Sequence, residues 1–354
     1  MRIGLLASVG HMVDSFFPEI IETWTAAGHS VSVAAGTPTA DGDSVVISGL
    51  GRRPGPGAVT AWAGLRRWVR SERLDVVVTN SATASALVRT ARLEVPVVYF
   101  CHGLHWNTGT ELGDRVWQQV EHALLRRTAG VIAINSDDHA WFGQRFDPQR
   151  LLRLRSGVGL DLERYRYGEP LPQSADDRLE LVWIGEFSAR KRPNLALDVV
   201  LGLESRGVDV HLRMIGDGDL RSATRERIRR LGLSGRVTAD GPGSVVVALT
   251  HSHGLLHTSA WEGLPRVMLE AVAVGRRAYA FDVKGVRDVP EAVLAADGDA
   301  GALAAAVHAD WASGRMTAPL DFDRADLDYR LTGDAVRSFL EGLTDRRTAG
   351  QGVR

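Results

Sequence analysis

The chain reads MRIGLLASVGHMVDSFFPEIIETWTAAGHSVSVAAG over residues 1–36. This stretch contains a short apolar run at 3–7, a longer amphipathic pattern at 16–27 and a second apolar run at 31–35. Short β-branched runs predict strands, and the longer pattern between them predicts a helix. A strand–helix–strand rhythm is typical of a parallel sheet covered by helices on both faces.

The same rhythm continues along the first half and restarts in the second. Further strands are predicted in the first half at 45–47, 76–79, 95–100 and 131–134, and helices at 59–71 and 113–128. The second half has predicted strands at 179–184, 210–215, 254–257 and 278–281, with helices at 193–206, 220–231, 265–274 and 301–313. The fold class is therefore α/β, with two Rossmann-like, doubly wound parallel-sheet domains that we expect to face each other across a cleft.

The domain boundary is predicted in a polar segment that contains Pro and Gly, GEPLPQSADD. A length of 354 residues suits two domains, since domains of roughly 100–200 residues are usual. We expect a first domain at 1–167, this linker at 168–177 and a second domain at 178–325. A C-terminal helix is expected at 326–343, with a return to the first domain left open, and a frayed tail at 344–354.

The composition excludes several classes of protein. Hydrophobic residues make up 44% and charged residues 24%, as in an ordinary globular chain. The net charge of -1 argues against a general nucleic-acid binder. A single cysteine, Cys101, cannot form an internal disulfide, which favours a cytoplasmic location. No apolar stretch reaches the roughly 20 residues needed to span a bilayer.

One basic stretch leaves membrane contact open. Residues 59–73 carry Trp62 and Trp68 among four arginines. Tryptophan and arginine on an amphipathic helix are typical of docking at a membrane surface. The same pattern fits a sheet-packing helix with a solvated basic face, which is the interpretation we favour. A peripheral location at the inner face of the membrane stays the alternative.

The first domain offers candidate residues directly after its strands, where open parallel sheets bind ligands. Gly10 follows the first strand without the full G-x-G-x-x-G pattern, so a dinucleotide site is not expected. Gly10 nevertheless permits close approach of a phosphate, with a plain turn glycine as the alternative. His102 and His105 follow the strand at 95–100. No acidic or cysteine partner stands at metal-ligand spacing, so we expect His102 to donate a hydrogen bond to a polar substrate.

The second domain has a predicted anion site in the loop that begins at Gly185. Arg190 and Lys191 precede a helix that is predicted to open at Pro193. Cationic side chains, free backbone amides and the helix dipole all favour an anion there. Of the 42 basic residues, only Lys191 and Lys284 are lysines, which draws attention to this position because the two side chains are not interchangeable.

A second constellation lies in the stretch SAWEGLPRVMLE at residues 259–270. A short helix is predicted from Pro265, so the amides of Gly263 and Leu264 lie at its positive end and suit a diphosphate. Glu262 and Glu270 would repel that anion. Their presence makes sense if they accept hydrogen bonds from a ribose on one side of the diphosphate and a sugar on the other.

These residues resemble a known family. Glu262-Gly263-Leu264-Pro265 with Glu270 is similar to the paired-glutamate motif of the retaining GT-B glycosyltransferases of family 4, and the exopolysaccharide and capsule branch is resembled most. The resemblance extends over most of the chain. The other stretches that carry it are 157–165, 215–220, Arg236-Val237 with Gly241, His102-Gly103-Leu104-His105, His11 before Pro18, and Gly185-Glu186 followed by Arg190-Lys191.

The resemblance implies a donor site for a nucleotide sugar, with UDP favoured over GDP and dTDP, and no cofactor or metal. Arg190 and Lys191 would hold the diphosphate, and His102 the donor sugar. Other implied donor contacts are Gly10, Gly185, Val237 near the base, Glu262, Gly263 and Leu264 on the sugar, and Glu270 on the ribose. The catalytic set would be His102, Glu262, Arg190 and Lys191.

The acceptor is left open by the sequence. It is expected to be a hydroxyl of a saccharide, a lipid-linked saccharide or a natural product. Two other activities stay as alternatives, namely a nucleotide-sugar epimerase with the same fold and a catalytically silent subunit that binds sugar nucleotides.

Overall fold

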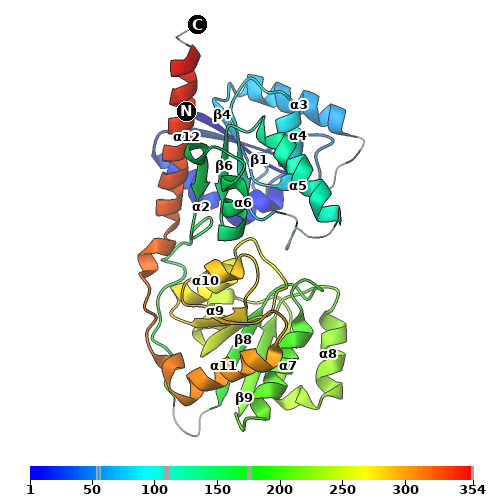
Figure 1. Cartoon of the computed structure of the whole chain (residues 1–354), viewed down its shortest axis with the longest axis vertical. Coiled ribbons are helices and arrows are strands. Elements are labelled where there is room, and N and C mark those ends of the chain that lie inside the picture. The colour runs from blue at the N-terminus through cyan, green and yellow to red at the C-terminus, as the bar shows by residue number, and fades with distance from the viewer. Residues whose placement is uncertain (53–54, 56, 105, 107–111, 174–177, 352–354) are drawn as a thin grey trace. The chain divides into compact units, whose positions relative to one another are not determined.

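The computed structural model describes residues 1–52, 55, 57–104, 106, 112–173 and 178–351. Its backbone forms two compact units (Figure 1). Unit 1 comprises Met1–Gly159 and Asp328–Arg354, and unit 2 comprises Leu160–Leu327. The chain therefore passes from one unit to the other twice. The first passage falls at Gly159–Leu160, ahead of the linker predicted at 168–177, of which 174–177 lie outside the described residues.

Unit 1 is built on a parallel sheet with strand order β3-β2-β1-β4-β5-β6-β7. Its strands are β1 (Arg2–Ala7), β2 (Ser30–Ala35), β3 (Val45–Val46), β4 (Val76–Thr79), β5 (Val97–Cys101), β6 (Gly130–Ala133) and β7 (Leu151–Arg153). Its helices are α1 (Gly10–Phe16), α2 (Pro18–Ala26), α3 (Ala58–Ser71), α4 (Ala82–Thr90), α5 (Leu112–Leu125) and α6 (Ser136–Gly143). Every residue of β4, β5 and β6 is buried, as expected for central strands of a parallel sheet.

The helix predicted at 16–27 corresponds to α2, and α1, which precedes it, was not predicted. α1 ends at Phe16 and α2 begins at Pro18. Proline has no N–H to continue an existing helix, but it is favoured at the first position of a new one. Phe17 forms the junction and is fully buried.

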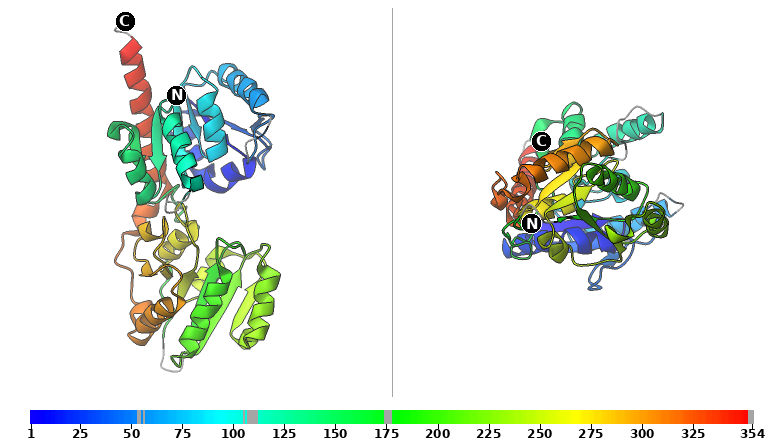
Figure 2. Two further views of the ribbon diagram at one scale, coloured as in Figure 1. Left: turned by 45° about the vertical axis from the view of Figure 1, so that its right-hand side comes forward. Right: turned by 90° about the horizontal axis from the view of Figure 1, so that it is seen from below.

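The C-terminal helix α12 (Tyr329–Gln351) belongs to unit 1 and packs against α2 (Figures 1 and 2). The indole Nε1 of Trp24 donates a hydrogen bond to the carbonyl of Gly333 at 3.1 Å. Gly130 lets α12 lie close to β6, because a Cβ there would come within 2.9 Å of Phe339. The helix continues through Gln351, whereas the sequence predicted a frayed tail from 344.

Unit 2 is built on a second parallel sheet, with strand order β10-β9-β8-β11-β12-β13. Its strands are β8 (Leu179–Ile184), β9 (Val210–Ile215), β10 (Val237–Asp240), β11 (Gly254–His257), β12 (Arg277–Phe281) and β13 (Val293–Ala295). Its helices are α7 (Pro193–Glu204), α8 (Arg221–Arg230), α9 (Val245–Thr250), α10 (Arg266–Ala273) and α11 (Ala300–Ala312). The predicted α/β class, with two doubly wound parallel sheets, is confirmed.

The helix singled out for membrane docking uses its tryptophans for packing. Trp68 of α3 is buried, and its Nε1 donates a 2.9 Å hydrogen bond to Ser32 Oγ. Trp62 is half-buried and donates to the carbonyl of Leu87 at 3.2 Å. Of the helices in the described part of the chain, none has the length and apolar character that a membrane crossing requires.

Candidate functional site

The candidate site of unit 2 lies at the carboxyl edge of its sheet. β8 and β11 are neighbouring strands, and each ends in a loop that carries predicted site residues. The loop after β8 holds Arg190 and Lys191, and the loop after β11 holds Glu262. Because parallel strands end at the same edge, residues 71 and 72 positions apart along the chain are brought into contact there.

The loop after β8 is held in place by the turn after β9. Phe187 donates its N–H to the carbonyl of Asp217, and Leu220 donates back to the carbonyl of Phe187, both at 2.8 Å. Gly216 has a φ of 145°, and a Cβ there would lie 1.9 Å from the carbonyl oxygen of Gly185. Only glycine allows this approach, so the glycines of the 215–220 turn serve to position the cationic loop.

Glu262 binds Arg190 and Lys191, the two cationic residues that are predicted to hold the diphosphate. Its Oε1 accepts a hydrogen bond from Lys191 Nζ at 2.6 Å, and its Oε2 accepts one from Arg190 Nη1 at 2.8 Å. The Nε2 of His257, the last residue of β11, lies 3.4 Å from Glu262 Oε1. Arg190 also stacks over the ring of Trp261, with its Cζ 5.2 Å from the ring centroid.

Glu262, Lys191 and His257 are largely buried, and their protonation states depend on that burial. Burial alone would raise the pKa of Glu262, but His257, Lys191 and Arg190 outweigh it and hold the pKa well below its ordinary range. Burial lowers the pKa of Lys191 against the opposing attraction of Glu262. Burial likewise lowers the pKa of His257. At neutral pH Glu262 is therefore a carboxylate facing two cations and a neutral imidazole.

The backbone after Glu262 is fixed by the loop after β12. Glu262 donates its N–H to the carbonyl of Lys284 at 3.0 Å. Gly285 has a φ of 77°, and a Cβ there would lie 2.4 Å from the carbonyl oxygen of Gly263. The loop that carries Glu262 and Gly263 thus rests directly on a glycine backbone.

The start of α10 presents backbone amides next to this cluster. Pro265 is the N-cap residue and the helix begins at Arg266, one residue later than predicted. Within the described part of the chain, the N–H groups of Gly263 and Leu264 make no hydrogen bond to protein. They are the donors that the sequence assigned to a diphosphate.

Glu270 lies one turn into α10 and is also buried. Its Oε1 accepts a 2.7 Å hydrogen bond from the hydroxyl of Tyr165 and a 3.2 Å bond from Arg266 Nε. Burial and the nearby carboxylate raise the pKa of Tyr165 to about 12, so the tyrosine stays a hydrogen-bond donor at physiological pH. The two glutamates have separate partner sets, in keeping with separate roles.

Val237 and Gly185 are the two other residues of unit 2 that were predicted to contact the donor. Val237 begins β10 and its side chain belongs to the hydrophobic core. Gly185 directly follows β8, where a Cβ would make ordinary contacts with Trp183 and Lys191. Their assignment to the donor stays a prediction.

Unit 1 places its two predicted residues at the carboxyl ends of β1 and β5. Gly10 donates its N–H to Thr37 Oγ1 at 3.0 Å, and a Cβ on it would lie 2.1 Å from the carbonyl oxygen of Pro38. This close packing explains the glycine, and a phosphate contact stays a prediction. His105 lies outside the described residues.

His102 stacks on the ring of Phe100, with a centroid distance of 4.7 Å. Burial lowers its pKa to about 4, so its imidazole is neutral at physiological pH. Its Nε2 is buried without a hydrogen-bond partner among the described residues. A neutral imidazole with one unsatisfied nitrogen suits the predicted hydrogen bond to a polar substrate.

The sequence analysis missed several residues of these surroundings. His257 contacts Glu262 but lies in an apolar strand. Tyr165 contacts Glu270 but lies before the predicted domain boundary. The hydroxyls of Ser188 and Ser259 are buried and have no hydrogen-bond partner within the part of the chain that the structure describes. Both serines lie in the loops that carry the cation–carboxylate cluster. These serines could be predicted only if it were known which loops lie next to each other in the fold.

Metal ligands were not expected at this site. Among the residues with described positions, no three His, Cys, Asp or Glu side chains gather so as to hold a metal ion. The metal-independent chemistry implied by the resemblance stays a prediction.

Comparison with known families agrees with the two-domain architecture. Residues 13–157 match the model described as a glycosyl transferase 4-like domain, and residues 178–310 match that of the glycosyl transferases group 1. These two domains together define the GT-B class of glycosyltransferases. The chain belongs to family 4 of that class, as its motifs implied.

Two curated proteins share parts of the sequence. A putative glycosyltransferase, EpsF of Bacillus subtilis, is 29% identical over 196 residues, which are 51% of this chain and 50% of EpsF. An alpha-D-kanosaminyltransferase of Streptomyces kanamyceticus is 30% identical over 131 residues, or 36% of this chain and 32% of that enzyme. The matched region thus spans half or less of these relatives.

Solved structures share the fold over the full length. HepE of Anabaena, in complex with UDP, has a TM-score of 0.72 at 17% identity and covers 100% of both chains. The sucrose-phosphate synthase of Thermosynechococcus elongatus has a TM-score of 0.69 at 17% identity, over 97% of this chain and 95% of its own. At this identity the likeness establishes the GT-B fold.

Proposed function

We propose that the protein transfers a sugar from a nucleotide-sugar donor to a hydroxyl group, with retention at the anomeric carbon and without a metal. A UDP-sugar is the favoured donor. The acceptor is a saccharide, a lipid-linked saccharide or a natural product. Family membership supports the reaction class, and HepE, which shares the fold, binds UDP.

The observation that carries the proposal is the buried carboxylate that holds two cations. Glu262 accepts charge-assisted hydrogen bonds from Arg190 and Lys191, as a diphosphate would. An incoming diphosphate competes for these cations and is also met by the amides of Gly263 and Leu264. Glu262 is then released to accept hydrogen bonds from the hydroxyls of the donor sugar.

In this mechanism the enzyme stabilises charge that builds up on the departing diphosphate. Arg190 and Lys191 neutralise it, while departure and attack take place on one face of the sugar. Loss of a single donor to a developing anion typically costs about 10²–10³ in rate. Glu270, held by Tyr165, is the proposed acceptor for the ribose hydroxyls.

The test is incubation of the full-length protein with a panel of mass-tagged nucleotide sugars, followed by chromatography of the products. Slow release of free sugar in the absence of acceptor is the expected result. Conversion of one nucleotide sugar into its epimer would make the protein an epimerase. Tight binding without turnover on any acceptor would make it a silent binding subunit.

A further inference from the structure

Arg192 directly follows Arg190 and Lys191, so the loop after β8 carries three cations in a row. The first two were predicted to hold the diphosphate, whereas Arg192 was given no role. The side chain of Arg192 is 20% exposed. Its contacts also set it apart, because Arg190 and Lys191 donate to the carboxylate of Glu262 and Arg192 donates to two main-chain carbonyls and a different carboxylate.

The guanidinium of Arg192 joins the loop after β8 to two other loops. Its Nε donates to the carbonyl of Thr258 at 2.8 Å, and its Nη2 donates to the carbonyl of Ser259 at 2.7 Å. Both acceptors lie in the loop after β11, which carries Glu262. The same Nη2 donates to Asp297 Oδ1 at 2.6 Å, in the loop after β13. Three of the five N–H donors of the guanidinium are therefore used to hold loops.

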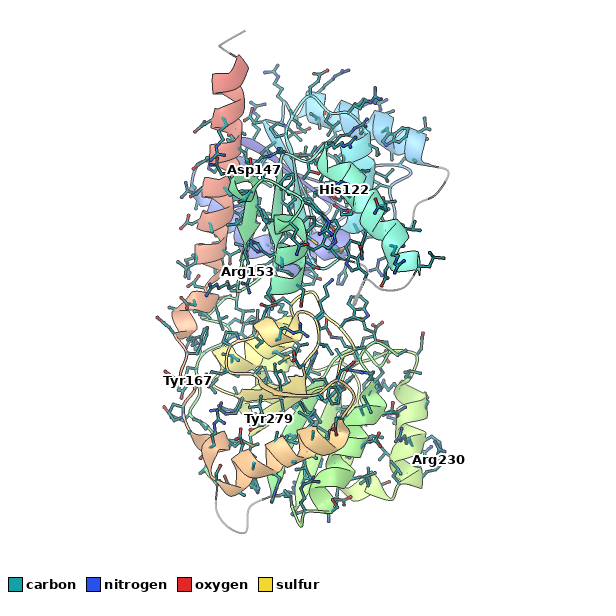
Figure 3. All side chains as sticks on the ribbon, viewed as in Figure 1. His122, Asp147, Arg153, Tyr167, Arg230 and Tyr279 are labelled. Atoms are coloured by element: carbon teal, nitrogen blue, oxygen red, sulfur yellow. The ribbon has the colours of Figure 1, made fainter. Side chains whose placement is uncertain are left out.

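The ring of Phe281, at the end of β12, packs against this guanidinium. The Cζ of Arg192 lies 5.0 Å from the ring centroid. Figure 3 labels Tyr279, which precedes Phe281 by two residues on the same strand and is also fully buried. Because residues two apart on a strand share a face, Phe281 lies on the side of the sheet that Tyr279 marks. Arg192 is thus fixed between a buried aromatic ring and two loops.

Further hydrogen bonds join the loops after β8 and β11. Thr258 Oγ1 donates to the carbonyl of Lys191 at 2.8 Å, and Ala260 donates its N–H to the carbonyl of Arg190 at 2.8 Å. The cationic loop is therefore fastened to the loop of Glu262 through its backbone as well as through the side chain of Arg192. Together these contacts set the distance between the cations and the carboxylate.

The backbone of Arg192 is strained. Its φ of 49° and ψ of 53° place it in the left-handed region, where a Cβ lies too close to the following carbonyl. Glycine or asparagine adopts this conformation at lower cost. Strained residues persist where surrounding contacts impose the conformation, and they cluster at functional sites. Arginine at this position is therefore explained by its side-chain contacts, all of which glycine would lose.

We propose that Arg192 is a positioning residue of the diphosphate site. It holds the loop after β11 so that Glu262 and the amides that follow it lie opposite Arg190 and Lys191, and it does not contact the donor itself. Asp297 fixes the guanidinium in place. This inference rests on the proposed function, because it assigns a role within the donor site. A displacement of about 1 Å at such a site can lower the rate roughly 10²-fold, so the position of the loop matters as well as its charges.

The experiment is calorimetric titration of UDP into the full-length parent protein and into Arg192→Lys. Lysine keeps the positive charge but not the planar fork that reaches two carbonyls and a carboxylate. We therefore expect this variant to bind UDP about tenfold more weakly. Inorganic diphosphate should lose affinity by the same factor, because the diphosphate is the part of UDP whose site is displaced.

Asp297→Asn gives a sharper test, because electrostatics and positioning predict opposite signs. Removal of a negative charge near an anion site should by itself raise the affinity for UDP. Loss of the carboxylate that fixes Arg192 should instead lower the affinity, by about threefold. Asp198→Asn is the matched control, because Asp198 Oδ1 accepts from Arg227 Nη2 at the same distance of 2.6 Å, but between the helices α7 and α8. This control should bind UDP like the parent.

A double variant tests whether Arg192 acts through its neighbours. If the guanidinium serves to place Glu262 against Lys191, Arg192→Lys/Lys191→Ala should bind UDP only about twofold to threefold more weakly than Lys191→Ala alone. Melting temperatures close to that of the parent will show that the variants are folded. Should Arg192→Lys fail to fold, Asp297→Asn still decides the question, since the Asp297 side chain is 50% exposed.

The outcomes separate this inference from the proposed function. A parent protein that does not bind UDP would contradict the donor site itself. A parent that binds UDP, together with parent-like affinity in Arg192→Lys or parent-like or tighter binding in Asp297→Asn, would refute the positioning role alone. Losses that multiply in the double variant would make Arg192 an independent ligand contact instead.

Discussion

Lys191 Nζ lies 2.6 Å from Glu262 Oε1, and this contact joins two loops that are 71 residues apart in the sequence. Lys191 and Glu262 are both largely buried, with side chains 13% and 10% exposed. A buried ion pair is costly to desolvate and is retained where its charges have further use. Under the proposed function, that use is an exchange of partners when the donor binds.

The pH dependence of stability should report on Glu262. The folded state holds the pKa of Glu262 below its ordinary value of 4.5, so the unfolded chain takes up this proton first as the pH falls. The stabilisation is complete above about pH 4.5 and is lost below it. Glu262→Gln should therefore lower the free energy of unfolding by about 1–3 kcal/mol at neutral pH, and the difference should shrink in acid.

Urea unfolding of both proteins between pH 7 and pH 3 measures this effect. Glu163→Gln is the control, because Glu163 forms an exposed pair with Arg166. That variant should differ little from the parent at any pH, since exposed pairs contribute little. A constant difference for Glu262→Gln down to pH 3 would contradict the assigned ionisation.

Lys191→Ala should weaken binding of nucleoside diphosphates by about tenfold to a hundredfold, because one charged hydrogen bond to the diphosphate is lost. Lys191→Arg should recover only part of the affinity, since a planar guanidinium does not replace a compact ammonium. Calorimetry with UDP measures both. Arg206→Ala, at an exposed arginine beyond the end of α7, serves as the control. Unchanged affinity in a folded Lys191→Ala protein would remove Lys191 from the site.

Glu270→Ala should reduce the affinity for UDP by about tenfold while leaving that for inorganic diphosphate nearly unchanged, since only UDP carries the ribose. Tyr165→Phe should show the same selectivity with a smaller loss, because Tyr165 only orients the carboxylate. Competition binding with the two ligands measures the ratio. Equal losses for both ligands would show that Glu270 does not serve the ribose.

Gly285→Ala should destabilise the protein and weaken donor binding together. Both Gly285 and Gly298 have a positive φ, of 77° and 78°, but a Cβ at Gly298 would meet nothing within 4 Å. Gly298→Ala thus measures the backbone cost alone, about 1–2 kcal/mol. Gly285→Ala should add about 1–3 kcal/mol of steric strain against Gly263. Thermal unfolding and UDP binding of the two variants test this, and equal behaviour would mean that the contact is unimportant.

EDTA should leave glycosyl transfer unchanged, because the proposed cations are supplied by Arg190 and Lys191. Transfer assays with the chelator, and with Mn²⁺ or Mg²⁺ added back, provide the measurement. Activity that is lost with EDTA and restored by a divalent cation would require a metal in the reaction.

The sequence predicted most of the two sheets because their long strands are continuous apolar runs. Its apolar pattern did not predict β7, β10 or β13. β7 and β13 have three residues each, and β10 alternates apolar and polar residues in VTAD. The helix α4 was also missed, since ATASALVRT is rich in small and hydroxyl residues. Short elements of this kind are stabilised by neighbours that are distant in the chain.

The candidate site was predicted residue by residue but not as a unit. Arg190, Lys191 and Glu262 were each assigned to the donor, and their contact with one another came only from the adjacency of β8 and β11. His257 was hidden because it ends an apolar strand and resembles a core residue in sequence. Proximity across a sheet depends on strand order, which local patterns do not specify.

Because α12 belongs to unit 1, the order of translation affects how unit 1 folds. Residues 1–159 of unit 1 are translated before unit 2, yet the helix that covers Trp24 and Gly130 is translated only after unit 2. Unit 1 therefore lacks α12 and stays incomplete while unit 2 is translated and folds. A premature stop near residue 327 would remove α12. It would therefore destabilise unit 1, most of which is formed by the N-terminal part of the chain.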